Sequence, residues 1–163
     1  MLFRSGHLLC HLSNILSNMN YQTRSIFPFH RVNCPFVLVG KQILQEACSL
    51  GLEWDAPLPD PLIERYKEWC LQLFSLSEIR IERCVKLLSF IVSSVEFHHF
   101  ADANVSGYGV CSYLRLIDSL GNVSVKLVFS KSRVSPLRPI TVPRLELTAA
   151  VLATRCSVML ERV

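Results

Sequence analysis

The strongest constraint on the fold is a change in the spacing of apolar residues near residue 85. Before that point apolar residues recur every three or four positions, which is the period of an amphipathic helix. After it the chain becomes rich in β-branched and aromatic residues and alternates between apolar and polar positions, as strands do. A single change of this kind predicts helices followed by a sheet, the α+β class.

Two helices are predicted before the change, over residues 34–50 and 61–76. Gly51 is well placed to cap the end of the first helix, and Asp60 and Pro61 suit the start of the second. The apolar residues that recur at helical spacing are Val39, Ile43, Ala47 and Leu50 in the first helix, and Leu62, Tyr66, Trp69, Leu73 and Leu76 in the second.

Three strands and a final helix are predicted after the change. The strands cover residues 95–102, 107–116 and 123–130, and their short connections favour antiparallel hairpins. A basic connection with two prolines follows, and Pro143 opens the helix. On the second strand, one face is expected to hold Tyr108, Val110, Ser112, Leu114 and Leu116. On the helix, one buried stripe is expected at Leu145, Ala149, Leu152, Cys156 and Met159.

The composition says more about the environment of the protein than about its function. Half of the residues are hydrophobic, which supports a packed core, and the net charge of +4 is compatible with nucleic acid without requiring it. The seven cysteines are widely spaced and form no C-x-x-C pair, so the chain lacks zinc-ligand spacing and a reducing, intracellular location is expected. No apolar run approaches the ~20 residues that a membrane span needs, so no membrane association is expected.

Two carboxylates are the candidate catalytic and metal-binding residues. Asp102 stands at the end of the first predicted strand, and Glu146 stands in the first turn of the final helix. Cleavage of a phosphodiester by two metal ions needs several carboxylates at one point, and these two are expected at the same edge of the sheet. From spacing alone, a solvated or capping role is at least as reasonable for each.

The short sequence motifs around Asp102 and Glu146 are more specific than the spacing of these two residues. Residues 100–104 (FADAN), followed by 107–109 (GYG), resemble the first-strand motif of retroelement ribonuclease H domains. Residues 130–137 (SKSRVSPL) and 141–150 (TVPRLELTAA) resemble a segment of BEL/Pao retrotransposon polyproteins, a region filed under the name Pao retrotransposon peptidase. Residues 41–46 and 52–59 resemble the stretch that links reverse transcriptase to ribonuclease H in those polyproteins. The resemblance covers about residues 34–160.

This resemblance implies a fold, an activity and a division of the chain. It implies a helical connection over residues 34–84 and a truncated ribonuclease H-like unit over 85–163, and the residues before them, 1–33, are expected to be a poorly ordered leader. The implied ancestral activity is Mg²⁺-dependent cleavage of RNA in RNA–DNA hybrids, with Asp102 and Glu146 as the first two metal ligands. The family's third and fourth acidic groups have no counterpart, so the isolated chain is expected to be inactive, with an unpaired apolar edge at residues 97–102.

Four basic residues near the final helix are the candidate contacts to nucleic acid. Lys131, Arg133, Arg138 and Arg144 surround the approach to the final helix, where contacts to nucleic-acid phosphates and a simple solvated loop are equally expected. Residues 118–121 (DSLG) carry one residue more than an aspartic-protease turn and are predicted to form a hairpin turn instead. The alternative to an enzyme fragment is a non-enzymatic remnant that binds nucleic acid or protein. The expected partners are an RNA–DNA hybrid or other nucleic acid and the remainder of the polyprotein.

Overall fold

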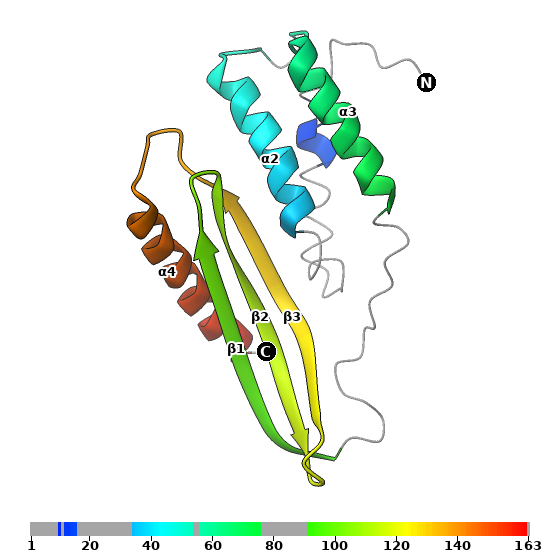
Figure 1. Cartoon of the computed structure of the whole chain (residues 1–163), viewed down its shortest axis with the longest axis vertical. Helices are drawn as coiled ribbons and strands as arrows, with labels where there is room; N and C mark the ends of the chain where they lie inside the picture. Colours follow the sequence, from blue (N-terminus) through cyan, green and yellow to red (C-terminus); the bar gives the residue numbers. More distant parts are fainter. Residues whose placement is uncertain (1–9, 11, 16–33, 54–55, 76–90, 163) are drawn as a thin grey trace.

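The computed structural model describes residues 10, 12–15, 34–53, 56–75 and 91–162 of the chain. Residues 12–15 are helical, helices α2 and α3 come next, and a three-stranded sheet and a long helix follow (Figure 1). This order confirms the predicted α+β class. The elements are α2 (Cys34–Ser49), α3 (Asp60–Ser75), β1 (Val92–Ala103), β2 (Gly107–Asp118), β3 (Val123–Val134) and α4 (Val142–Leu160).

The sheet is an antiparallel meander with β2 in the centre. Strand β1 pairs with β2 and β2 pairs with β3, as the short connections predicted. In this register Asp102 lies opposite Gly109, and Gly109 lies opposite Ser132. β1 is therefore an edge strand of the described sheet.

The two faces of the sheet differ because only one of them carries α4. Val110 of β2 is buried together with Leu152 and Cys156 of α4. Because paired residues of an antiparallel ladder share a face, Ala101, which lies opposite Val110, also belongs to this side. We call this side the α4 face and the opposite side the far face. The predicted stripe from Tyr108 to Leu116 on β2 occupies the α4 face, as expected.

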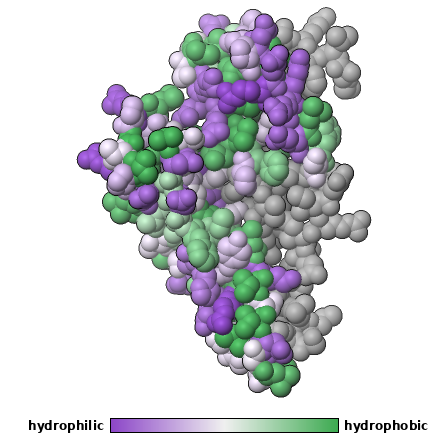
Figure 2. All heavy atoms as spheres, viewed as in Figure 1, coloured by the Kyte–Doolittle hydropathy of each residue, from purple (hydrophilic) through white to green (hydrophobic). Residues whose placement is uncertain are grey.

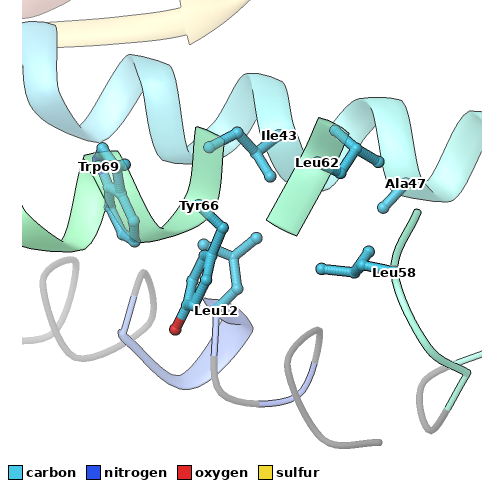
Figure 3. Close-up of a cluster of buried hydrophobic side chains, with 7 residues drawn as sticks. All are labelled: Leu12, Ile43, Ala47, Leu58, Leu62, Tyr66 and Trp69. Atoms are coloured by element: carbon cyan, nitrogen blue, oxygen red, sulfur yellow. The ribbon is translucent and has the colours of Figure 1, made fainter. Parts of the chain in front are cut away.

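Helices α2 and α3 enclose a second, separate core (Figure 3). Trp69 is its largest fully buried side chain, and the indole nitrogen donates a hydrogen bond to the Phe36 carbonyl oxygen over 2.7 Å. The buried members are Leu12, Ile43, Ala47, Leu58, Leu62, Tyr66 and Trp69. Leu12 belongs to the segment predicted as a leader, so at least this residue packs with the helices. The proposed boundary at residue 33 stays a prediction.

The apolar stripes of the helices are only partly buried, and the buried stripe predicted for α4 is wrong at Met159. Val39 and Leu50 are exposed, because Val39 lies at the margin of the α2 stripe and Leu50 follows the last helical residue. Met159 is 45% exposed, since the buried stripe of α4 ends at Cys156. Leu76 lies outside the described residues.

Strand β3 is longer than predicted and continues through Val134. Lys131 and Arg133, expected in a connecting loop, are therefore strand residues. Glycines on β2 allow the close pairing here: a side-chain carbon at Gly107 would lie 2.8 Å from the Arg133 carbonyl oxygen, and one at Gly109 would lie 3.0 Å from the Lys131 carbonyl oxygen.

The helical pair meets the sheet along β3 through polar contacts. The Lys41 ammonium donates to the Ser132 carbonyl oxygen over 3.0 Å, and the Gln45 amide donates to the Ser135 carbonyl oxygen over 2.7 Å. Figure 2 shows hydrophilic side chains gathered toward the end of the molecule that holds these helices, with apolar side chains exposed along the sheet. None of the described helices is both long enough and apolar enough to cross a membrane.

The β2–β3 turn predicts a pH dependence of stability. The Asp118 carboxylate accepts hydrogen bonds from the Asn122 side chain and from the backbone N–H groups of Leu120 and Asn122. These bonds, that of the Asn122 side chain first, lower the pKa of Asp118. The stabilisation is complete above the unfolded pKa, ~3.9, and is lost as the pH falls through the lower folded value.

We therefore expect Asp118→Asn to destabilise the protein at neutral pH and to matter less as the pH falls. Urea unfolding of both proteins between neutral pH and about pH 3 measures this difference. A difference in the free energy of unfolding that stays constant over that range would contradict the prediction.

Candidate functional site

The candidate site lies at the end of the sheet where β1 ends and β2 begins. The meander also brings the end of β3 to this place, and the connection after β3 leads directly into α4. In Figure 1 the start of α4 lies beside the tip of β1. Both predicted carboxylates and the basic connection thus lie at one end of the sheet.

Asp102 is the second-last residue of β1 and is exposed to solvent. The turn after it is held by Asn104, whose side-chain oxygen accepts hydrogen bonds from the N–H groups of Ser106 and Gly107 at 2.8 and 2.9 Å. Gly109 lies opposite Asp102 and has no side chain, so no side chain projects from the sheet at this position of β2. Even-numbered residues of β1 from Ser94 onward share the far face, and Asp102 is one of them.

Glu146 is the fifth residue of α4, so it lies just past the first turn rather than within it as predicted, and it is also exposed. Thr141 precedes the helix in an extended conformation, and its carbonyl oxygen accepts hydrogen bonds from the N–H groups of Arg144 and Leu145. Leu145 is buried and anchors this first turn of the helix. Glu146, the next residue, is held at the margin between the packed side of α4 and solvent.

The structure brings the two carboxylates to one end of the sheet but not to one face. Asp102 lies in the far-face register, whereas Glu146 is carried by the helix on the other side. Their oxygen donors suit Mg²⁺, a hard cation that prefers carboxylates. Within the described ranges, however, no three His, Cys, Asp or Glu side chains are grouped so that they could hold a metal ion. The donor type fits a divalent metal, whereas the number of ligands and their placement do not form a complete site.

The four predicted phosphate-binding residues fall into two groups. Lys131 and Arg133 lie on the α4 face of β3, opposite Val110 and Tyr108. Both are close enough to Cys156 to influence it: burial raises the pKa of that thiol, and these two cations act in the opposite direction. Arg138 is exposed in the connection and Arg144 is exposed in the first turn of α4. The cations therefore flank α4 at its start and along β3.

One polar pair under α4 was not predicted as a pair. The His99 Nδ1 lies 2.8 Å from the Ser112 hydroxyl oxygen, and Ser112 is 0% exposed. The other ring nitrogen of His99 is buried without a hydrogen-bond partner in the described part of the chain. His98, the preceding residue, lies on the far face beside Glu96, because neighbouring residues of a strand point to opposite faces. Only the strand register reveals that His99 meets Ser112, and the burial of this serine argues against a nucleophilic role.

A comparison with protein families agrees with this arrangement. A family model described as "Pao retrotransposon-like RNaseH-like domain" matches residues 16–163. This chain belongs to that family. The match confirms the resemblance to BEL/Pao retrotransposons, and it extends upstream of the segments that carried the resemblance. No curated protein and no solved structure matches the chain.

Membership in the Pao family allows the positions of Asp102 and Glu146 to be interpreted. RNase H-like domains generally use divalent metal ions, and a strand-end Asp with a helix-borne Glu is the pair that the resemblance implied. The first motif, residues 100–109, forms the β1–β2 hairpin end, and residues 141–150 form the start of α4. The hairpin turn at residues 118–121 is confirmed, so this segment does not form an aspartic-protease turn.

The buried His99–Ser112 pair predicts that the stability of the protein is sensitive to substitution at Ser112. We expect Ser112→Ala to leave both ring nitrogens of His99 without protein partners and to lower the free energy of unfolding by ~1–3 kcal/mol. Ser119→Ala, in the exposed β2–β3 turn, is the matched control and is expected to change stability by less than ~0.5 kcal/mol. Chemical denaturation of the three proteins tests this, and equal midpoints for all three would refute the role of the pair.

Proposed function

We propose that this chain supplies the first two metal-binding carboxylates of a ribonuclease H-like nuclease that cleaves RNA in RNA–DNA hybrids within a retrotransposon polyprotein. The observation that carries the proposal is the family match combined with the placement of Asp102 at the tip of β1 and Glu146 near the start of α4, at one end of the sheet.

The roles of the two residues follow from their positions. Asp102 is exposed beside Gly109, so a nucleic-acid backbone can approach this carboxylate without meeting a neighbouring side chain. Glu146 faces solvent from a turn that is anchored by Leu145. In a complete site, divalent metal ions would activate water and stabilise the leaving oxygen.

Two carboxylates alone are a weak magnesium site. Mg²⁺ demands near-ideal octahedral geometry and gives up its water reluctantly, so its affinity depends on several well-placed ligands. We therefore expect the chain on its own to bind Mg²⁺ weakly and to leave hybrids uncleaved. The further ligands would have to come from elsewhere in the polyprotein.

The metal proposal is tested with Mn²⁺, which takes the same oxygen ligands and broadens nearby amide resonances in NMR spectra. We expect broadening around Asp102 and around Glu146 at the same Mn²⁺ concentration, and a loss of both effects in Asp102→Asn and in Glu146→Gln. Glu64→Gln, on the exposed side of α3, is the control and should behave as the wild type.

Two results would count against this assignment. Broadening that persists in both variants would place the metal elsewhere. Hybrid cleavage by the wild-type chain that disappears in Asp102→Asn would keep the site and overturn the expected inactivity.

A second candidate function, nucleic-acid binding without cleavage, is favoured by the cations of β3. The described sheet contacts of α4 lie chiefly on β1 and β2, so Lys131 and Arg133 stay exposed on the same face beside the helix. With Arg138 and Arg144 they can follow a phosphate backbone around the start of α4. Such contacts are mainly electrostatic and do not depend on sequence.

This binding is tested by its dependence on salt. We expect the affinity for an RNA–DNA hybrid to fall as salt rises, and the slope of log affinity against log salt to drop by about 1 in Lys131→Ala and in Arg133→Ala. Lys67→Ala, on the exposed side of α3, should leave the slope unchanged. Fluorescence anisotropy at several salt concentrations measures it, and equal slopes for all four proteins would exclude these cations from the interface.

A further inference from the structure

The α4 face of β3 carries a row of cations with an aromatic ring among them. Strand pairing places Lys126 and Phe129 opposite members of the β2 stripe that lies on the α4 face, so both share this face with Lys131 and Arg133. A β-bulge next to Ser112, where β3 has one residue more than β2, allows the even-numbered Lys126 to share a face with the odd-numbered residues after it. We call these four β3 residues the β3 strip. At ~3.3 Å per residue the strip spans about 20 Å.

Helix α4 lies beside the β3 strip and does not cover it. Its contacts with the described sheet lie chiefly on β1 and β2, and in Figure 1 it lies toward the β1 side of the sheet, away from β3. Burial raises the pKa of Cys156 in α4, and Lys131 and Arg133 act against that rise, so these two cations lie close to the helix. Both are nevertheless exposed to solvent. The strip is therefore an accessible row of side chains alongside a helix.

The β3 strip is rich in positive charge. β3 (VSVKLVFSKSRV) contains no Asp or Glu, and the β2 stripe from Tyr108 to Leu116, which faces the same side of the sheet, contains none either. A straight row of Lys and Arg attracts phosphate groups mainly by charge and without regard to base sequence. By charge alone, the strip would bind any nucleic acid.

Phe129 distinguishes the β3 strip from a simple cationic surface. Its ring is half-buried and packs against the cluster between β2 and α4, so it is held in place between Lys126 and Lys131. Proteins that bind single-stranded nucleic acid combine a cationic track for the backbone with aromatic rings on which bases stack. Unpaired bases can turn toward such a ring, whereas bases inside a duplex are already stacked on one another.

We propose that the β3 strip binds single-stranded nucleic acid, with backbone phosphates along the cations and a base against Phe129. This inference rests on the second candidate function, because both use Lys131 and Arg133, and it names the ligand more narrowly. A hybrid offers phosphates but no unpaired base, and its backbone winds away from a straight row of charges. A nuclease that removes RNA from hybrids leaves a DNA strand, and that strand is a ligand of this kind.

The test compares one labelled strand in two states by fluorescence anisotropy. The probe is a labelled oligothymidylate, used alone and annealed to oligoriboadenylate. We expect the wild type to bind the free strand more tightly than the hybrid. Phe129→Leu keeps an apolar side chain for packing but removes the ring. It should weaken binding of the free strand about tenfold and leave binding of the hybrid unchanged, because only unpaired bases stack on the ring.

Two further variants separate stacking from charge. Lys126→Ala should lower the slope of log affinity against log salt for the free strand by about 0.7, the value for one phosphate contact to a single strand. Phe74→Leu makes the same change as Phe129→Leu on the exposed side of α3 and is its matched control, so it should bind both probes like the wild type.

A second measurement needs no variant. In NMR spectra of the wild type, the ring protons of Phe129 should shift upfield on titration with the free strand and shift much less with the hybrid. A ring that does not respond to the free strand, or Phe129→Leu binding that strand as well as the wild type does, overturns the proposal. Equal losses for both probes overturn it but keep the charge-based function, whereas binding of neither probe overturns both.

Discussion

The register of β2 with its two neighbours is the constraint on which the rest of the structure depends. β2 is hydrogen-bonded on both sides, and Val110 ties it to Leu152 and Cys156 of α4. Because side chains alternate along a strand, this single register fixes the face of every residue on β1 and β3. It puts His99 against Ser112 beneath the helix, Asp102 on the far face, and Lys131 and Arg133 beside α4.

The sequence predicted the elements and their order because each had a strong local signal. Helical spacing and good capping residues marked α3, and alternating apolar residues marked β2. The errors came from long-range packing, which a local pattern does not contain. β3 continues past Ser130 because Gly107 and Gly109 of another strand let it approach. Val39 is exposed because it lies at the margin of the stripe that α2 buries, away from the side on which Lys41 and Gln45 reach β3.

The candidate site was predictable in its residues but not in its geometry. Motif resemblance singled out Asp102 and Glu146, and the family match supports the ribonuclease H-like domain to which that resemblance pointed. Strand alternation alone does not say which face of β1 the helix covers, so the separation of these carboxylates across the sheet edge needed the structure. The His99–Ser112 pair was hidden for the same reason, because its members belong to different strands.

The most direct test of this account is an NMR measurement of contacts between α-protons across β1 and β2. Since Ala101 and Val110 form a non-hydrogen-bonded pair, their α-protons should lie close together and give a strong nuclear Overhauser effect, as should those of Ala103 and Tyr108. A strong effect between Asp102 and Val110 instead would reveal a one-residue slip. Such a slip would move Asp102 to the α4 face and would contradict the placement of the site described above.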